Sequence, residues 1–452
     1  MNKDKVVVVG MARSGVAAAM LLAGQGKNVV VCDAKSRDEL EKQLAPLKDI
    51  KNIEYMLADE SKNALDGAGT LILSPGVPMT NPLIAEAVSK GIEVISEIEL
   101  AYRNDKGTLV AITGTNGKTT TTALTGEIFQ NAGKLTYVVG NIGLPYTNVV
   151  SETMPESVTV CEVSSFQLES VVDYRPKVSA VLNITEDHLN RHGDMKTYIA
   201  MKERIFENQR DDDVVVLNYD DEVTRDMSNR AKCRVEWFSR LNKPEHGAFV
   251  VAGFIVYGKK DDYRTICNVA DVSIPGPHNL ENALAATAMA MSAGIPAPVI
   301  RHTLRTFKGV EHRMEYVRTL DDVRYINDSK GTNVDSTIKA IQSMTAPTVI
   351  ILGGSDKHVS MLPLAREVAV GNISHVVLCG ATSAVIAKAL DEVGYADYEN
   401  ADMDFERAVD MARKAAKPGG NVLLSPACAS FDLFRDFEHR GEEFKRIVNG
   451  LS

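Results

Sequence analysis

The chain has few cysteines, and none belongs to a recognisable metal or disulfide pattern. Its 452 residues include six cysteines, and no two of them form a Cys-x-x-Cys pair. They lie far apart, at positions 32, 161, 233, 267, 379 and 428. This scatter argues against a zinc site and against a disulfide framework. We therefore expect the protein to work in the reducing cytoplasm.

A basic charge excess and long apolar runs are also absent. The formal net charge is −10 and no long Lys/Arg stripe offsets it, so nucleic acid is not the expected partner. No apolar run reaches the length of a membrane span, and we expect no membrane association. Lys3 and Lys5 precede an apolar stretch, but Arg13 and several glycines interrupt it. This interruption argues against a targeting segment.

What the chain does contain is an alternation of short β-branched runs with helical patterns. No internal repeat or low-complexity segment stands out. The apolar runs are continuous, which fits parallel strands covered on both faces. They lie at 6–9, 29–31, 71–73, 109–112, 178–182, 214–217, 349–352, 376–378 and 422–424. An α/β architecture with parallel sheets is therefore predicted.

The length of the chain and the order of these runs predict three domains. With 44% hydrophobic and 24% charged residues, the 452-residue chain reads as globular and is long enough for two to four domains. We place three domains at 1–103, 104–309 and 310–452. The middle domain includes an irregular, β-rich stretch from about 233 to 275.

Residues 111–120, Ala-Ile-Thr-Gly-Thr-Asn-Gly-Lys-Thr-Thr, have the composition of a phosphate-binding loop. An apolar strand precedes Gly114 and Gly117, and a helical pattern follows Lys118 and Thr119. Glycines let backbone N–H groups approach phosphate oxygens, and the following helix presents the positive end of its dipole. The lysine supplies charge near the β- and γ-phosphates, and the threonine hydroxyl can bind Mg²⁺. Only two residues separate the glycines, whereas the common loop of this kind has four.

A second glycine pattern begins the chain and resembles a dinucleotide-binding fingerprint. Gly10 and Gly15 follow the first strand, but Ala12 stands where the middle glycine belongs. Asp33 ends the next strand, where such folds place an acid that contacts a ribose. A nucleotide-shaped crevice that holds something other than NAD is the preferred interpretation. The segment 74–78 after a later strand is a rigid Pro-Gly turn.

Polar side chains end two further strands of the middle domain. Glu162 ends the strand-like run 158–163, and a carboxylate there suits Mg²⁺, although most such acids are simply solvated. Asp187 and His188 follow the run 178–182, at the edge where α/β sheets bind ligands. Lys202, taken alone, would be a solvated lysine on a helix.

The last polar groups lie at a helix start and in the third domain. Asn279 could be a helix N-cap, while Asn282 one turn later could reach an adenine or a phosphate. Arg313 and Lys330 could clamp phosphate charge, and Asp328 suits a ribose hydroxyl. The segments 353–357 and 425–432, with Lys357 and Ser430, suggest a pocket for an anionic small substrate. Cys428 lies there too, and a passive buried thiol is preferred to a nucleophile.

Taken together, these motifs resemble those of the Mur ligase family of peptidoglycan biosynthesis. The short loop 113–119 is typical of that family and of its folylpolyglutamate synthase relatives. The segments 141–145, 162–169, 311–313 and 327–333 are similar to those of the branch that adds D-glutamate. The likeness runs in order along essentially the whole chain. A motif Asp-Asn-Pro-Arg, frequent in the branch that adds diaminopimelate or lysine, is absent from the sequence.

The resemblance implies a Rossmann-like first domain, a central P-loop ATPase domain and a Rossmann-like third domain. It implies ATP-dependent amide ligation with two Mg²⁺ ions, through an acyl phosphate. The groups expected at ATP are Gly114, Thr115, Asn116, Gly117, Lys118, Thr119, Thr120, Asn282, Arg313, Asp328 and Lys330. The expected metal ligands are Thr119, Glu162, His188 and a carbamylated Lys202. Lys118, His188 and Lys202 would serve the reaction itself.

The resemblance also implies the two other substrates, UDP-N-acetylmuramoyl-L-alanine and D-glutamate. The residues expected at the UDP-sugar are Ser14, Asp33, Lys35, Gly76, Asn141 and His188. Those expected at D-glutamate are Thr332, Lys357, Ser430 and Phe437. One departure concerns the uridine contact, because Ala34-Lys35 stands where the family often has Thr-Arg. A lysine keeps the charge but lacks the two-pronged geometry of arginine.

Several alternatives to this function stay open at the level of sequence. One is another amide ligase of the Mur type with a different acceptor. A folylpolyglutamate-type ligase shares the loop, but the roughly 100 residues before Thr108 argue against it. A non-catalytic nucleotide-binding protein would need the loop but not Glu162 and His188. An NAD-dependent oxidoreductase is disfavoured by Ala12. A monomer is expected.

Overall fold

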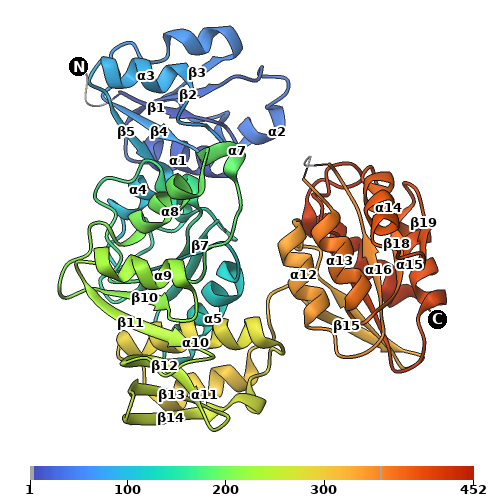
Figure 1. Ribbon diagram of the computed structural model, residues 1–452. Helices are drawn as coiled ribbons and strands as arrows, with labels where there is room; N and C mark the ends of the chain where they lie inside the picture. The colour runs from blue at the N-terminus through green and yellow to red at the C-terminus, as the bar shows by residue number, and fades with distance from the viewer. Residues whose placement is uncertain (1–4, 142, 357–358, 452) are drawn as a thin grey trace. The chain divides into compact units, whose positions relative to one another are not determined.

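The computed structural model describes residues 5–141, 143–356 and 359–451, and these form three β-sheets with helices on their faces (Figure 1). The chain divides into two compact units. The first comprises Met1–Ser273 and Asn279–Phe307, and the second comprises Ile274–His278 and Lys308–Ser452. The first unit holds two of the sheets, so the domain boundary expected near 103 lies inside it. The predicted α/β architecture is confirmed.

The first sheet has five parallel strands in the order β3-β2-β1-β4-β5. The strands are β1 (Lys5–Val9), β2 (Asn28–Asp33), β3 (Ile53–Leu57), β4 (Thr70–Leu73) and β5 (Glu93–Ser96), and the helices are α1 (Arg13–Gly24), α2 (Glu41–Leu44), α3 (Pro82–Ser89) and α4 (Glu97–Tyr102). Val6 and Val8 pack in the core with α1, while Val7 and Val9 pack in the core with α3. The strand is apolar throughout because both of its faces are covered. The strand order reverses between β1 and β4, which is where such sheets form a crevice for a ligand.

The second sheet has nine strands in the order β14-β13-β12-β11-β10-β9-β6-β8-β7. Its strands are β6 (Thr108–Thr113), β7 (Thr136–Gly140), β8 (Val158–Glu162), β9 (Val178–Val181), β10 (Val214–Asn218), β11 (Arg234–Ser239), β12 (His246–Val251), β13 (Phe254–Lys259) and β14 (Asp262–Asn268). The helices of this region are α5 (Lys118–Asn131), α6 (Ser165–Leu168), α7 (Leu189–His192), α8 (Met195–Glu203), α9 (Glu222–Met227), α10 (Pro277–Ser292) and α11 (Ala297–Thr306). From β7 through β8, β6, β9, β10 and β11 to β12, neighbouring strands pair in parallel. At the other edge, β12, β13 and β14 pair antiparallel. The predicted β-rich stretch thus extends the sheet at one side.

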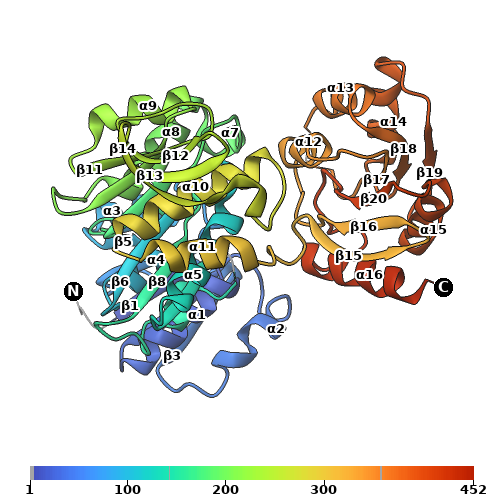
Figure 2. The same cartoon turned by 90° about the horizontal axis from the view of Figure 1, so that it is seen from below.

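The third sheet has the order β15-β16-β20-β17-β18-β19, and all of its pairs are parallel except β15 with β16. Its strands are β15 (Glu315–Leu320), β16 (Val323–Asn327), β17 (Thr348–Leu352), β18 (Ile373–Leu378), β19 (Tyr398–Asn400) and β20 (Asn421–Leu424). Helices α12 (Val334–Gln342), α13 (Leu362–Val370) and α14 (Ser383–Glu392) cover one face, and α15 (Phe405–Ala415) and α16 (Phe437–Gly450) cover the other (Figure 2). Within the part of the chain described, no helix has both the length and the apolar character needed to cross a membrane.

Helix α4 joins the first sheet to the second through buried carboxylates. Glu99 is fully buried and accepts hydrogen bonds from the backbone N–H groups of three successive residues of the loop before β9, Val172, Asp173 and Tyr174, at 2.9, 3.0 and 3.0 Å. Arg103, which directly follows α4, donates to Glu99 at 2.8 Å. Because a buried carboxylate is stable only when it is paired and hydrogen-bonded, these contacts fix α4 against the loop.

Glu97 is a second buried carboxyl group of α4, with fewer partners. Its Oε1 accepts a hydrogen bond from the Gln167 side chain at 2.8 Å, and its Oε2 has no hydrogen-bond partner among the described residues. Burial raises the pKa of Glu97 to about 7, although the Gln167 bond opposes this shift. The folded protein therefore holds a proton that the unfolded chain releases at lower pH.

This proton makes stability depend on pH. The pKa of Glu97 is raised in the folded state, so its contribution to stability is complete below its ordinary pKa of 4.5 and is lost as pH rises through about 7. We expect Glu97→Gln to be as stable as the parent protein at pH 5 and more stable at pH 8, by roughly 2–3 kcal/mol. Urea unfolding at the two pH values measures the difference. Glu54→Gln, at an exposed position of β3, is the control and should change neither value. Equal stability of Glu97→Gln and the parent protein at pH 8 would contradict the neutral, buried state of Glu97.

Candidate functional site

The phosphate-binding loop connects β6 to α5 at the point where the strand order of the second sheet reverses. Strand β6 lies between β8 and β9, so the ends of both neighbours flank the loop. Gly114 and Gly117 have φ angles of +144° and +83°, which favour glycine. A Cβ atom on Gly117 would lie 2.3 Å from Oδ1 of Asn282, and one on Gly114 would lie 3.0 Å from Cβ of Leu182. Backbone conformation therefore favours glycine at both positions, and a side chain at Gly117 would also displace the Asn282 amide.

Asn183, just beyond β9, holds the loop in place. Its backbone carbonyl accepts from the N–H of Thr115 at 2.9 Å, and its side chain exchanges two hydrogen bonds with the backbone of Asn116, at 2.8 and 3.1 Å. The hydroxyl group of Thr115 lies 3.1 Å from that of Tyr198 in α8. Sequence reasoning missed Asn183 and Tyr198. The position of Asn183 at a strand end was a usable signal, but only the strand order shows that this end lies beside the loop.

Two lysines converge on one carbonyl oxygen of the loop. Nζ of Lys118 donates to the carbonyl of Gly114 at 2.9 Å, and Nζ of Lys202 donates to the same oxygen at 2.8 Å. Lys202 is buried, so the interpretation of it as a solvated helix lysine is wrong. Lys202 lies on the face of α8 that is turned towards the loop. Its Nζ lies 4.8 Å from the ring centre of Tyr198, on the same helix. Burial, reinforced by the charge of Lys118, holds the pKa of Lys202 well below its usual value.

Glu162 ends β8 and presents a carboxylate oxygen to the interior. The residue is 1% exposed, and its Oε1 accepts from the Asn141 side chain at 2.8 Å. Its Oε2 is buried without a hydrogen-bond partner among the residues described. Thr119, in the first turn of α5, is also buried. A buried, unsatisfied carboxylate oxygen is the kind of donor that a hard divalent cation requires, so Glu162 fits a Mg²⁺ ligand.

His188 follows β9 and has a constrained backbone. Its φ angle of +54° lies in the left-handed region, which is uncommon for a residue with a side chain. Its ring lies 4.7 Å from the ring of Phe166, and its Nε2 lies 3.4 Å from the Asp187 carboxylate. Partial burial lowers the pKa of His188, and the charges of Lys118 and Lys202 lower it further, while Asp187 opposes them. The imidazole is therefore a neutral donor or ligand at neutral pH.

Asn279 and Asn282 lie on the side of α10 that faces the loop helix α5. The Asn282 side chain accepts from the Thr121 hydroxyl at 3.2 Å and donates to Asn279 at 3.1 Å. Helix α10 begins at Pro277, so the interpretation of Asn279 as an N-cap is wrong, since it lies inside the first turn. Both asparagines are buried next to the loop.

The first sheet forms a smaller polar site at its own strand reversal. The Asp33 carboxylate accepts from the backbone N–H groups of Met11 and Lys35, at 2.7 and 3.0 Å, and so joins the two turns. Ser14 lies in the first turn of α1, which has no side-chain cap among the described residues. Lys35 is exposed. The site therefore offers an open helix N-terminus, which suits a phosphate group.

Gly76 lies near this strand reversal, in the exposed turn that follows β4. The turn is anchored at Ser74, whose hydroxyl group donates to the carbonyl of Gly10 at 2.6 Å. The structure therefore brings the turn carrying Gly76 beside the first glycine turn.

In the second unit, the strand ends of the third sheet gather the remaining predicted residues. Asp328, after β16, accepts from the Ser425 hydroxyl at 2.7 Å and from the N–H of Met314 at 3.2 Å. Burial raises its pKa to about 6, although the Arg313 charge opposes the shift. Nε of Arg313 is buried without a hydrogen-bond partner among the described residues. Lys330 lies 5.0 Å from the ring centre of Phe437.

Arg440 of α16 ties two of these loops together and was missed by sequence reasoning. It is 2% exposed and donates to the hydroxyl and carbonyl of Ser329, at 3.0 and 2.8 Å, and to the carbonyls of Cys428 and Ala429. Ser430 follows directly and is buried, whereas Thr332 is partly exposed. Lys357 lies outside the described residues. Cys428 is buried with its Sγ 3.3 Å from the Thr382 hydroxyl, as expected of a passive thiol.

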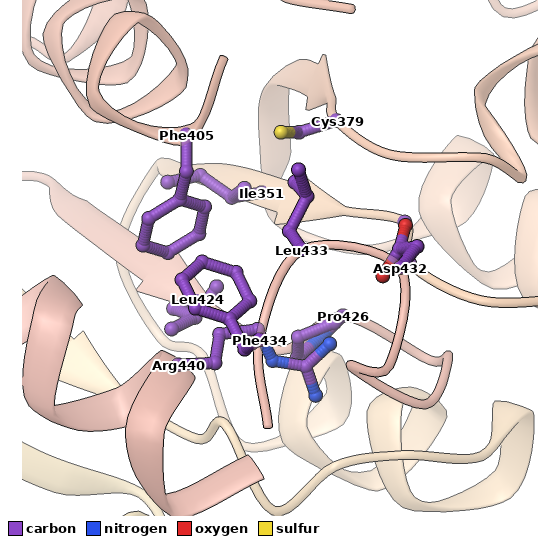
Figure 3. Close-up of a pocket in the computed structure, with 11 residues that line it drawn as sticks. Ile351, Cys379, Phe405, Leu424, Pro426, Asp432, Leu433, Phe434 and Arg440 are labelled. Carbon is purple, nitrogen blue, oxygen red and sulfur yellow. The ribbon is translucent and has the colours of Figure 1, made fainter. Parts of the chain in front are cut away.

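A small pocket lies beside the Arg440 guanidinium group (Figure 3). Its volume of about 10 Å³ is at the limit for one water molecule, so it is too small for an amino acid. The lining includes Asp432, whose carboxylate accepts from the N–H of Ala381 at 3.0 Å. The pocket is therefore a packing feature behind the strand ends.

Three family profiles match successive parts of the chain. Residues 4–96 match the Mur ligase MurD-like N-terminal domain, residues 112–290 the Mur ligase middle domain, and residues 312–428 the Mur ligase glutamate ligase domain. The UDP-N-acetylmuramoylalanine–D-glutamate ligase of Thermoanaerobacter sp. (strain X514) is 45% identical over 99% of this chain and 98% of its own length. The enzyme of the same name from Clostridioides difficile (strain 630) is also 45% identical, with the same two coverages.

Solved structures share the fold at low sequence identity. The UDP-N-acetylmuramate–alanine ligase MurC of Thermotoga maritima superposes with a TM-score of 0.62 at 19% identity, covering 98% of this chain and 99% of that one. A MurF structure from Acinetobacter baumannii gives a TM-score of 0.62 at 16% identity, covering 98% and 93%.

The packing around Gly117 leads to a testable expectation. Gly117→Ala would place a methyl group against Asn282 in a left-handed backbone, and we expect ATP affinity to fall at least about tenfold. Calorimetric titration with a non-hydrolysable ATP analogue measures this loss. Gly133→Ala is the matched control, because Gly133 has a similar φ of +75° but open space at its Cβ position, after α5. A similar loss of affinity in both variants would mean that backbone strain, not the loop contact, is responsible.

Proposed function

The chain belongs to the Mur ligase family, and from this premise we infer that it is an ATP-dependent ligase of peptidoglycan precursor synthesis. It adds D-glutamate to UDP-N-acetylmuramoyl-L-alanine and forms an amide bond, releasing ADP and phosphate. The observation that carries this conclusion is the 45% identity to the D-glutamate ligases along 99% of the chain. A folylpolyglutamate ligase, a non-catalytic nucleotide binder and an NAD-dependent oxidoreductase would not account for matches to Mur ligase domains that begin at residue 4 and extend to residue 428.

The reaction requires two anions to meet. The substrate carboxylate attacks the γ-phosphorus of ATP, ADP leaves, and an acyl phosphate forms. The amine of D-glutamate then attacks the acyl carbon, and phosphate leaves. Cationic groups must offset the charge that gathers at the phosphate in the first step. We propose that Lys118 and the dipole of α5 do this, and that positioning rather than a protein nucleophile drives both steps.

We assign ATP to the loop and to groups from both units. The loop contributes Gly114, Thr115, Asn116, Gly117, Lys118, Thr119 and Thr120, and Asn282 lies against it at Gly117. Arg313, Asp328 and Lys330 of the second unit complete the proposed set. Their support is local: Arg313 has an unsatisfied buried donor, and Asp328 is buried beside it.

Mg²⁺ is the metal that this reaction uses, and we propose two ions. Bound there, Mg²⁺ would neutralise phosphate charge. Thr119, Glu162, His188 and Lys202 are the proposed ligands, and the orphaned Oε2 of Glu162 is the strongest support. Lys202 would serve after carbamylation of its amine, which converts a cation into an anionic oxygen donor. Its lowered pKa favours the neutral amine that such a reaction with CO₂ needs.

The two remaining substrates are assigned to separate sets of residues. Ser14, Asp33, Lys35, Gly76, Asn141 and His188 are proposed to hold the UDP-sugar, and Asn141 donates directly to Glu162. Thr332, Lys357, Ser430 and Phe437 are proposed to hold D-glutamate. Division into domains at 1–103, 104–309 and 310–452, a monomeric state and a cytoplasmic location without membrane association complete the proposal.

The acceptor is tested by phosphate release. With Mg-ATP and UDP-N-acetylmuramoyl-L-alanine, we expect release with D-glutamate and none above background with L-glutamate, L-alanine, L-lysine or diaminopimelate. Lys118→Ala should lose at least about a hundredfold in rate, because the charge that offsets the phosphates is removed. Release with another acceptor would assign the chain to a sister branch of the family. Full activity of Lys118→Ala would refute the site.

Lys202 is tested by chemistry that only an amine can show. Lys202→Arg keeps a positive charge but cannot form a carbamate, so we expect it to lose at least about a hundredfold in rate without losing its fold. In the parent protein, ¹³C-bicarbonate should give a carbamate signal by NMR that disappears in Lys202→Arg. Lys196→Arg, one to two turns earlier on α8, is the control and should keep both the signal and the rate. An active Lys202→Arg variant would exclude the carbamate.

A further inference from the structure

Arg191 connects the first sheet to the catalytic region of the second through contacts that the proposed reaction does not use. It lies in α7, the short helix that directly follows His188. Its Nη2 donates to the carbonyl of Val77 at 2.9 Å and to Glu169 at 2.6 Å, while Nε donates to the other oxygen of Glu169 at 3.1 Å. Its Cζ also lies 4.9 Å from the ring centre of Phe166. One guanidinium group thus connects the turn after β4 with the α6 segment, which carries both Phe166 and Glu169.

The contacts of Arg191 hold its guanidinium group in a fixed orientation and are largely shielded from water. The Arg191 side chain is 16% exposed and that of Glu169 is 8% exposed, so water screens the pair only weakly. Two parallel hydrogen bonds to one carboxylate fix the plane of the guanidinium group, which lets it lie over the phenyl ring as well. A lysine could supply the charge but not this fixed plane.

On one side, Arg191 holds the turn that carries Gly76. Its acceptor, Val77, also donates its N–H to the carbonyl of Ser74 at 3.0 Å. The Val77 side chain lies so close to Gly10 that a Cβ there would be 2.8 Å from Cγ2 of Val77. Val77 therefore packs between the first glycine turn and Arg191, and its position affects both turns of the proposed UDP-sugar site.

On the other side, Arg191 contacts the aromatic ring that supports His188. Phe166 lies in α6, where Ser164 and Gln167 form a capping box just after Glu162. The centre of its ring lies 4.7 Å from that of His188, whose backbone has the uncommon left-handed conformation. The ring thus links the guanidinium group to the imidazole that is proposed to face both metal and substrate.

We propose that Arg191 is a positioning residue that sets the Gly76–Val77 turn at a fixed place relative to the His188 imidazole. The inference rests on the proposed function, because it takes that turn and His188 as parts of the UDP-sugar site. Arg191 itself contacts no substrate in this scheme. It acts through the carbonyl of Val77 and through Phe166, so that bound UDP-N-acetylmuramoyl-L-alanine presents its carboxylate to the γ-phosphate.

The test compares Arg191→Lys with Arg204→Lys. Arg204 is 25% exposed, donates to the carbonyls of Leu168, Glu169 and Val171 and pairs with Glu207, so it braces the same segment as Phe166 by other contacts. We expect Arg191→Lys to raise KM for UDP-N-acetylmuramoyl-L-alanine about tenfold and to lower kcat severalfold, with KM for ATP within about twofold of the parent value. Arg204→Lys should change melting temperature by a similar amount but leave all three kinetic constants near those of the parent protein.

A double-mutant cycle tests the route through the ring. Phe166→Leu keeps an apolar group and removes the aromatic face. If Phe166 transmits the effect, the losses in kcat of Arg191→Lys and Phe166→Leu will be less than multiplicative when combined. Multiplicative losses would remove the ring from the proposal.

Two results would overturn the inference while leaving the function intact. One is a parent-like KM for the UDP-sugar in an active Arg191→Lys enzyme. The other is an equal profile for Arg191→Lys and Arg204→Lys, which would make Arg191 a structural brace only. If the parent protein itself shows no turnover with D-glutamate, calorimetric affinity for UDP-N-acetylmuramoyl-L-alanine in parent and Arg191→Lys replaces the kinetics. An unchanged affinity would then refute the inference separately from the function.

Discussion

The convergence of two lysines on the carbonyl of Gly114 is the constraint on which the catalytic region depends. Nζ atoms of Lys118 and Lys202 lie 2.9 and 2.8 Å from the same oxygen, in a place where Lys202 has almost no access to water. Two neighbouring ammonium charges in such surroundings are unfavourable, so the buried lysine must lose its proton, react or gain an anion. The negative charges of Asp187 and Glu162 raise the pKa of Lys202, but they do not cancel the lowering caused by burial and by Lys118. A site with this excess of positive charge is one that an anionic group would stabilise.

The same region shows how strand order brings residues that are far apart in sequence to one site. Loop, carboxylate and histidine belong to three different segments, after β6, at the end of β8 and after β9. They meet because β6 pairs with both other strands in parallel, which brings all three carboxyl ends to one edge. The outer connections then add Tyr198 and Lys202 from α8 and the asparagine pair from α10. The third sheet repeats the arrangement, with Arg440 joining the loops after β16 and β20.

Much of this was predictable, and the omissions share a physical cause. Continuous apolar runs predicted the strands, because buried parallel strands leave no polar face to interrupt the pattern. The strand–turn–helix around Gly114, Gly117 and Lys118 was predictable, because an apolar run, a glycine-rich turn and a helical pattern follow one another in the sequence. Asn183, Tyr198, Arg191 and Arg440 were not, because their roles are contacts between segments far apart in sequence, and their residue types are common elsewhere. Lys202 shows the limit most clearly: in sequence it is an ordinary helix lysine, and only its burial against the loop makes it unusual.

The sequence by itself determined the local character of the protein: which turns are rich in glycine, which strands are buried on both faces, and, through its likeness to relatives along the whole chain, which family it belongs to. Tertiary structure decided the state of each group. Whether a carboxylate is satisfied, as Glu99 is, or left with an orphaned oxygen, as Glu162 is, depends on which N–H groups other segments bring to it. Proton affinity and hydrogen bonding depend on burial and on neighbours in space, and neither quantity is a property of a residue's position in the chain.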